Sequence, residues 1–323
     1  MNRSILLPSS YLLDQIVGDP EWFPHPVRFI GFAISRGESF LRRPDQIVEI
    51  ELLTGAILTI AIVGSTYWLT AAAISSAQRR SRFLGNATEL LLGWTCLAAR
   101  NLEQEATAVV DALHRADITL ARKRLARIVG RDTASLDSQE ISRAVIETVA
   151  ESASDGIIAP LFYMALGGVP LAMAYKAINT LDSMIGHADA NHFYFGKASA
   201  RLDDAANYIP ARLTALAIIA ASHVVTWADS QTAWQNWRRD GSKHKSPNAG
   251  QPESAISGAL HVMLGGSNTY AGEFIPAQRM GEEFPRPTPG KSTQAMSLVA
   301  IASLIGLTMG VLSTTLFQIR KRS

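Results

Sequence analysis

The sequence predicts an all-α fold: a polytopic integral membrane protein with helical extramembrane segments. Uncharged runs that could enter a bilayer occupy residues 52–78, 157–175, 213–228 and 292–319. Because a helix needs roughly 20 apolar residues to cross the hydrocarbon core, the first and last runs are long enough and the middle two are marginal. Alternating strand patterns beside hairpin turns are almost absent. In lipid, such a chain satisfies its backbone hydrogen bonds by forming helices.

We expect one membrane-embedded domain over residues 1–323, divided into consecutive segments. These are an N-terminal motif segment (1–51), membrane helices (52–99), a helical extramembrane segment (100–156), membrane segments (157–228) enclosing a polar motif at 176–212, a long polar loop (229–291), and a C-terminal membrane helix with a basic tail (292–323). The loop is expected because Gly, Pro, Ser and Asn are frequent at residues 240–291.

Residues 100–151 have the spacing of helices that lie outside a membrane. One apolar face recurs every three or four residues, at Leu102, Ala106, Val109 and Leu113. Asp117 can cap a second helix, which Gly130 ends. Asp137 and Glu140 have the spacing of a capping box, which predicts the start of a third helix.

The run at residues 157–175 raises a question of topology. If it and the run at 213–228 each crossed the membrane once, the polar motif between them would face the side opposite to its polar neighbours. Residues 167–170 (GGVP) can turn the chain, so we expect a re-entrant helical hairpin here, which membranes tolerate where protein covers the backbone.

Charge and cysteine content exclude some classes of function. The net charge of +2 gives no indication of nucleic-acid binding. The single cysteine, Cys96, excludes an internal disulfide and a cysteine-based zinc site. Basic residues cluster beside membrane segments, at 79–82 and 320–322, as they do on the cytoplasmic side of membranes. We therefore expect a multi-pass protein of the cell (inner) membrane.

Carboxylates gather in and beside the polar motif. Glu147, Glu151 and Asp155 are spaced by four, so a continuous helix would place them on one face. Asp203 and Asp204 form a second acidic cluster. Clustered carboxylates suit Mg²⁺, which takes a few protein oxygens together with substrate phosphates.

Other polar residues complete a candidate site. Arg201 and Arg212 flank the second acidic cluster and could each grip a phosphate or carboxylate with two parallel hydrogen bonds. Near the N-terminus, prolines fix a rigid, non-helical segment that carries Asp19, His25 and Arg28. Ionisable groups at a membrane boundary are costly unless they are paired or used, so we expect these segments to meet in one polar site.

Long segments of the chain resemble the cobalamin-biosynthesis CobD/CbiB family. They are residues 13–20 (LDQIVGDP), 24–28 (PHPVR), 128–133 (IVGRDT), 147–160 (ETVAESASDGIIAP), 175–186 (YKAINTLDSMIG), 195–196 (FG), 199–212 (SARLDDAANYIPAR), 239–241 (RDG) and 246–253 (SPNAGQPE). The segments follow the family's order and cover nearly the whole chain. One departure is Ser152, where the family usually has Asn.

The resemblance implies an adenosylcobinamide-phosphate synthase. Such an enzyme joins (R)-1-amino-2-propanol or its O-phosphate to the free propionate of adenosylcobyric acid, with ATP and Mg²⁺ as the expected activating agents. The residues that we expect to be catalytic are Asp19, His25, Arg28, Glu147, Glu151, Lys176, Asn179, Arg201 and Arg212. Those expected to bind substrate are Asn207, Asn248 and Glu253, and those expected to bind metal are Asp155, Asp182, Asp203 and Asp204.

Two other classes of function stay open. A membrane transporter would use charged residues to bind a substrate in transit, and inverted-repeat symmetry would support it. A membrane phospho- or prenyltransferase would use the two acidic clusters with Mg²⁺. For the family reading, the expected partners are the two substrates, the lipid bilayer and other membrane-bound enzymes of cobalamin assembly, with no nucleic acid.

Overall fold

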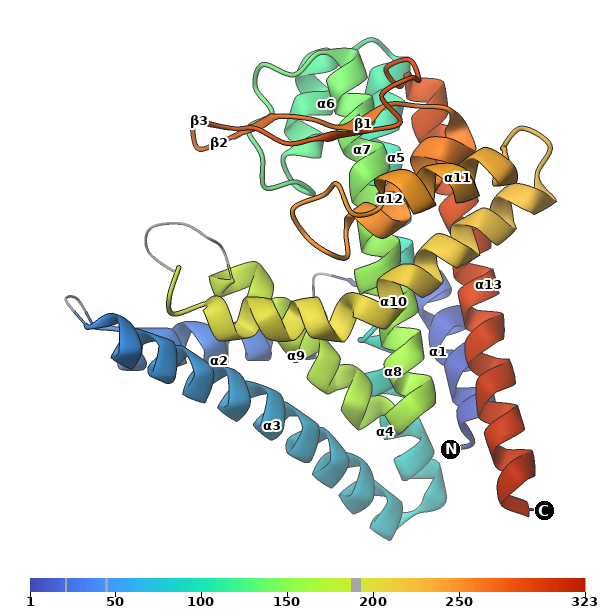
Figure 1. Ribbon diagram of the computed structural model, residues 1–323. Helices are drawn as coiled ribbons and strands as arrows, with labels where there is room; N and C mark the ends of the chain where they lie inside the picture. The colour runs from blue at the N-terminus through green and yellow to red at the C-terminus, as the bar shows by residue number, and fades with distance from the viewer. Residues whose placement is uncertain (21, 44–45, 187–192, 323) are drawn as a thin grey trace. The chain divides into compact units, whose positions relative to one another are not determined.

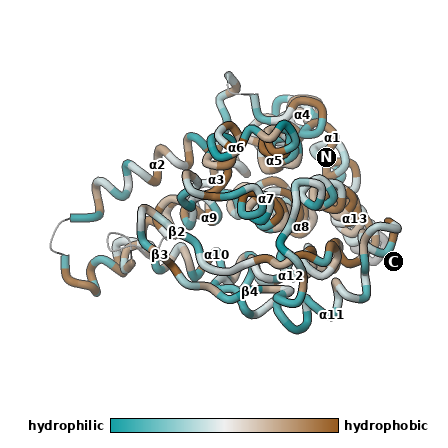
Figure 2. The backbone as a smooth tube through the Cα atoms, turned by 90° about the horizontal axis from the view of Figure 1, so that it is seen from above, coloured by the Kyte–Doolittle hydropathy of each residue, from teal (hydrophilic) through white to brown (hydrophobic). Residues whose placement is uncertain are grey.

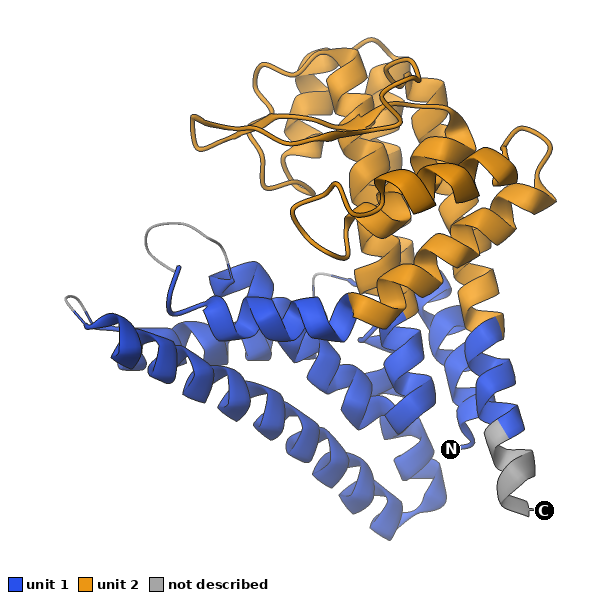
Figure 3. Cartoon of the chain, viewed as in Figure 1, with its two compact units in different colours: residues 1–98, 159–207, 309–323 blue, residues 99–158, 208–308 orange. Residues whose placement is uncertain are grey.

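The computed structural model describes residues 1–20, 22–43, 46–186 and 193–322, with the backbone alone given for 317–322. The residues group into two compact units (Figure 3). Unit 1 contains residues 1–98, 159–207 and 309–323, and unit 2 contains residues 99–158 and 208–308. Each unit draws on several of the segments expected from the sequence, whose domain boundaries stay a prediction.

Unit 1 is built from helices. They are α1 (Arg3–Val17), α2 (Pro26–Leu41), α3 (Val48–Arg80), α4 (Arg82–Trp94), α8 (Ala159–Gly167), α9 (Val169–Ile185) and the first part of α10 (Lys197–Val224). The long helix α3 packs against α4 on one part of its length and against α9 on another (Figure 1). Ile34, Leu58, Leu181 and Phe195 form part of the apolar core between α2, α3 and α9.

A helical hairpin interrupts the apolar run at residues 157–175. Helix α8 ends at Gly167, Gly168 adopts a φ of 76°, and α9 begins at Val169 with Pro170 in its first turn. A positive φ favours glycine, which explains why the chain turns at this residue. Helices α8 and α9 then pack against each other. The turn expected at residues 167–170 is confirmed, whereas its depth in a membrane stays a prediction.

Unit 2 contains helices and short strands. The helices are α5 (Ala99–His114), α6 (Ile118–Leu125), α7 (Ser138–Ala153), the π-helix η1 (Ser154–Ile158), the rest of α10, α11 (Ser230–Asp240), α12 (Gly250–Leu260) and the first part of α13 (Pro289–Arg322). Helix α11 is largely hydrophilic (Figure 2), whereas every residue of α12 is buried. The expected apolar face of α5 is confirmed, because Ala106, Val109 and Leu113 lie in the core.

Local capping explains where these helices begin. The Asp117 side chain accepts a hydrogen bond from Leu120 N at the start of α6. At the start of α7, the Asp137 side chain accepts from Glu140 N, and the Glu140 side chain accepts from Asp137 N in return. Both caps follow from the sequence, and such a cap contributes roughly 1 kcal/mol.

The expected long loop and the purely helical fold both need correction. Residues 229–291 contain α11, α12 and a β-ribbon, here called the ribbon, at residues 264–280. Its strands are β1 (Leu264–Gly265), β2 (Asn268–Tyr270), β3 (Glu273–Ile275) and β4 (Arg279–Met280). Antiparallel pairing joins β1 to β4 and β2 to β3. Strands this short are too brief for an alternating pattern to reveal them.

Two helices of the described residues are long and apolar enough to cross a membrane, namely α3 and residues Pro289–Leu316 of α13. Large apolar side chains stay exposed on α3, including Leu53, Ile60 and Trp68. The runs at 157–175 and 213–228 form no such helix. The first is broken at Gly168, and the second is the end of α10, whose N-terminal half is charged.

Candidate functional site

Helices α9 and α10 of unit 1 hold a group of buried polar side chains. The Tyr175 hydroxyl donates to Asn207 Oδ1 at 2.8 Å, and Asn207 Nδ2 donates to Asp203 Oδ2 at 2.9 Å. The Tyr163 ring stacks on Tyr175 with ring centroids 5.0 Å apart. Helical spacing explains the alignment, because Asp203 and Asn207 lie four residues apart on α10.

Asp203 is the most strongly perturbed acid of this group. Burial and, after it, the negative charge of Asp182 raise the pKa of the Asp203 carboxyl to about 7. Hydrogen bonds from Asn207 and Asn179 oppose that shift. Asp203 Oδ1 is buried and accepts no hydrogen bond of normal geometry from the described residues. A buried carboxyl oxygen without a donor is costly, so this oxygen suits a ligand that brings positive charge.

The four expected metal ligands are only partly assembled. The charges of Asp182 and Asp204 both raise the pKa of Asp203 in unit 1. Burial raises the pKa of Asp204 as well, and the charge of Arg201 only partly opposes that shift. Among residues 1–20, 22–43, 46–186 and 193–322, no three His, Cys, Asp or Glu side chains are arranged to hold a metal ion. Two carboxylates with neighbouring amides still fit Mg²⁺, which takes its other ligands from phosphate and water.

The N-terminal segment is rigid, as the prolines predict. His25 caps α2 by accepting from Val27 N at 3.3 Å, and its Nε2 lies 3.4 Å from Asp19 Oδ1. Pro26 occupies the first turn of α2, where its missing N–H costs nothing. Arg28 Nη1 reaches the Phe23 carbonyl at 3.5 Å. These contacts give all three expected catalytic residues of this segment a part in shaping it.

Unit 2 holds an ion-pair network around Glu147. Glu147 Oε2 lies 2.6 Å from Arg131 Nη2, and Glu147 Oε1 lies 3.3 Å from Arg143 Nη1. Gly265 N donates to Glu147 Oε1 at 2.8 Å, and both arginines donate to Asn268 Oδ1. Burial opposes ionisation, yet Arg131 and Arg143 hold the pKa of Glu147 below its usual range. We therefore see Glu147, expected to be catalytic, as the anchor that ties α7 to the ribbon.

Sequence reasoning missed Arg131, Arg143 and Asn268. Arg143 precedes Glu147 by four residues, which is a spacing that brings side chains together on a helix. Asp132, which follows Arg131 in the chain, also binds the ribbon. Asp132 accepts from Ala271 N and Gly272 N at 3.2 and 2.8 Å, and so holds the turn between β2 and β3.

The three carboxylates expected on one face of α7 have different surroundings. Glu147 is buried and Glu151 is exposed. The π-helix η1 starts at Ser154 and contains Asp155, and its wider turn changes the direction in which the following residues project. The regular four-residue spacing therefore does not continue as an α-helix through Asp155.

Glu253, Arg212 and Asn248 are the remaining predicted residues of unit 2. Burial, followed by the charges of Glu147 and Glu151, raises the pKa of Glu253 well above its usual range. Arg212 Nη1 donates to the Tyr208 carbonyl at 2.7 Å and lies 3.4 Å from Asn248 Oδ1. Its guanidinium stands 3.6 Å from the centre of the Tyr208 ring.

The expected residues thus fall into two sets. Unit 1 holds Asp19, His25, Arg28, Lys176, Asn179, Asp182, Arg201, Asp203, Asp204 and Asn207, and unit 2 holds Glu147, Glu151, Asp155, Arg212, Asn248 and Glu253. Arg212 with Asn248, and Asp203 with Asn207 and Asp182, are brought together as expected. The single site formed by all of them stays a prediction.

Comparison with known proteins gives consistent matches over most of the chain. The family model described as "CobD/Cbib protein" matches residues 7–299. The chain is 47% identical over 274 residues to "Cobalamin biosynthesis protein CobD" of Geobacter metallireducens, covering 85% of both proteins. It is 43% identical over 312 residues to the protein of that name from Pelobacter propionicus, covering 96% of this chain and 94% of that protein.

A relative with a different name also matches over most of the chain. "Cobalamin biosynthesis protein CbiB" of Salmonella typhimurium is 39% identical over 303 residues, which cover 93% of this chain and 94% of that protein. No solved structure matches the chain.

Proposed function

Because the chain belongs to the CobD/CbiB family, we propose that it acts in cobalamin biosynthesis as an adenosylcobinamide-phosphate synthase. It joins (R)-1-amino-2-propanol, or its O-phosphate, to the free propionate of adenosylcobyric acid. The curated relatives are named for cobalamin biosynthesis and match nearly end to end, which supports the pathway. The ligation chemistry is the finer part of the proposal.

The reaction requires an activated carboxylate. A carboxylate is a poor electrophile, so ATP transfers its terminal phosphoryl group to the propionate, and ADP leaves. The amine nitrogen then attacks the acyl carbon, phosphate departs, and the ammonium loses a proton to give the amide. The protein must orient three reactants and offset the phosphate charge. Arg212 fits that need, since Tyr208 and Asn248 engage one end of its guanidinium.

The observation that carries the proposal is the buried Asp203 carboxyl of unit 1. Its Oδ1 accepts no hydrogen bond of normal geometry from the described residues, and Asp182 adds a second negative charge nearby. Asp203 and Asp182, with the Asn179 amide, would hold Mg²⁺, which would offset the negative charge of a substrate phosphate group. The chain's own residues orient this carboxyl through the hydrogen bonds from Tyr175 to Asn207 and from Asn207 to Asp203.

A direct assay tests the proposal. Purified full-length protein is incubated with adenosylcobyric acid, aminopropanol phosphate and Mg-ATP, and amide product and ADP are measured. We expect both products from the wild-type protein and neither from Asp203→Asn. Asp111→Asn removes an exposed carboxylate of α5 and should leave turnover unchanged.

Other outcomes favour the alternatives. Uptake of a substrate into vesicles without chemical change supports a transporter. Transfer of a phospho or prenyl group without amide formation supports a transferase.

A further inference from the structure

We propose that an open pocket beside the ribbon binds the phosphate groups of a ligand, and that this ligand is a nucleoside triphosphate. The pocket has a volume of about 690 Å³, within the range of about 300–1,000 Å³ typical of small-molecule sites. All of its lining residues belong to unit 2. The choice of nucleotide rests on the proposed function, whereas phosphate binding follows from the pocket itself.

Arg279 is the central cation of the pocket. Its guanidinium forms no ion pair or hydrogen bond among the residues that the structure describes. Other arginines of this unit, such as Arg131 and Arg239, are paired with carboxylates. An unpaired guanidinium can donate two parallel hydrogen bonds to phosphate oxygens.

The side chain of Arg279 lies against the backbone of the ribbon. Gly266 has a φ of 88°, and a Cβ atom there would lie 3.5 Å from Cγ and Nε of Arg279. The stem of Arg279 therefore lies along the bare backbone of Gly266, which restricts the positions open to the guanidinium. A pre-positioned donor loses less entropy when it binds a ligand.

The other lining residues complete an anion site. Lys243 adds positive charge, although its Nζ also lies 2.7 Å from Asp240 Oδ1. Ser267 and Gln278 offer neutral hydrogen-bonding groups. Glu282 is the acidic residue of the lining, so the two cations exceed it by one charge. The balance favours an anion over a cation.

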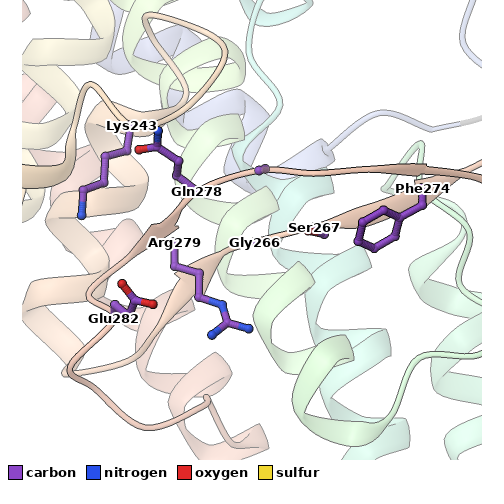
Figure 4. A pocket seen from close by; sticks show the side chains of 8 residues that line it. Lys243, Gly266, Ser267, Phe274, Gln278, Arg279 and Glu282 are labelled. Carbon is purple, nitrogen blue, oxygen red and sulfur yellow. The ribbon is translucent and has the colours of Figure 1, made fainter.

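Phe274 makes a nucleotide a better ligand than free phosphate. Figure 4 shows its ring at one end of the pocket, with Lys243 and Glu282 at the other end and Arg279 between them in this view. The Phe274 side chain is 67% exposed, so its ring is available to a planar group. Aromatic rings stack on nucleobases without regard to base identity, which would place the base at Phe274 and the phosphates near Arg279.

Binding measurements on the purified full-length protein in detergent test this assignment. Mg-ATP and tripolyphosphate are titrated into wild-type protein and variants by calorimetry. Arg279→Gln should weaken both ligands at least about tenfold, because a charge-assisted pair to phosphate is lost. Phe274→Leu should weaken Mg-ATP by severalfold and leave tripolyphosphate unchanged. The exposed Arg238 lies on α11 outside the pocket lining, and Arg238→Gln is the matched control.

The results separate this proposal from the ligase proposal. Arg279-dependent binding of both ligands supports the pocket, and tighter binding of Mg-ATP than of tripolyphosphate supports a nucleotide. Equal binding of the two, unaffected by Phe274→Leu, would overturn the nucleotide assignment and point to a phosphate from another substrate. Wild-type affinity in Arg279→Gln, or no binding by the wild type, would overturn the pocket. Arg279-dependent binding without any amide product would instead overturn the ligase.

Discussion

Glu147 in unit 2 and Asp203 in unit 1 are both acidic side chains with buried oxygens, yet their surroundings differ. Two arginines and a backbone N–H surround Glu147, and the pKa of its carboxyl is lowered. Asp203 has the amides of Asn207 and Asn179 and a second acid nearby, and its pKa rises to about 7. Burial raises a carboxyl pKa in both places, and the neighbouring charges decide the outcome.

The difference shows which carboxyl group has its oxygens engaged by hydrogen bonds from the protein itself. Both oxygens of Glu147 accept hydrogen bonds, from Arg131, Arg143 and Gly265 N, so its contribution is to the fold. Asp203 keeps an oxygen without a donor among the described residues, which is tolerable for a group that meets a ligand. Four variants can break or sharpen this contrast.

The largest effect is expected for Glu147→Gln. The substitution leaves Arg131 and Arg143 buried without their counter-charge, and breaking a buried pair in this way costs about 3–5 kcal/mol. Thermal unfolding in detergent should show a clearly lower midpoint. Glu103→Gln, which breaks an exposed pair with Arg100, should change it little. An unchanged midpoint for Glu147→Gln would mean that the network does not support the ribbon.

Asp203→Asn should have the opposite effect on stability. Because the folded-state pKa of Asp203 is about 7 against a reference of 3.8, the folded protein holds a proton that the unfolded chain releases. Wild-type stability should therefore fall as pH rises from about 4 to 7, and the full loss persists above pH 7. In EDTA at pH 8, Asp203→Asn should be more stable by about 2–4 kcal/mol.

The control for Asp203 is its pH dependence. The gain should vanish below about pH 4, where Asp203 is protonated in both states. A gain of the same size at pH 4 and pH 8 would show that packing, rather than charge, explains it.

Asp240→Asn tests a second carboxylate whose oxygens are engaged by other groups of the protein. Asp240 lies 2.7 Å from both Arg239 Nη2 and Lys243 Nζ, and accepts from Gly281 N at 2.8 Å. Burial opposes the shift, but these partners lower its pKa to about 2. Its stabilisation, about 1–2 kcal/mol, is present above about pH 4 and is lost as pH falls toward 2. Denaturant unfolding at pH 7 and pH 2.5 should show a smaller difference from wild type at pH 2.5 than at pH 7.

The smallest effect is expected for Arg212→Lys. Arg212 has N–H groups that remain available to a ligand. An arginine that grips an anion with parallel hydrogen bonds is poorly replaced by lysine. The variant should lose at least about tenfold in kcat/KM, about 1.4 kcal/mol, with normal expression. Unchanged kinetics would reduce Arg212 to an anchor of α10 and make Arg201 the next candidate.

The sequence by itself determined the features that depend on neighbours along the chain. The caps at Asp117 and Asp137, the core face of α5 and the break before Pro170 follow from spacing and backbone preference. The family also follows from the order of its segments. The caps, the core face and the break each depend on residues only a few positions apart. The family depends on the order of the segments along the chain.

Only the tertiary structure decided the features that join distant segments. Asn268 meets Arg131 across 137 positions, and Gly265 meets Glu147 across 118. Neither the ribbon nor the structural use of Glu147 could be read from residue types, since an acid on a helix can serve a fold or a reaction. A carboxyl's role depends on the charges that folding brings to it, because those charges determine whether it is ionised and whether its oxygens remain available.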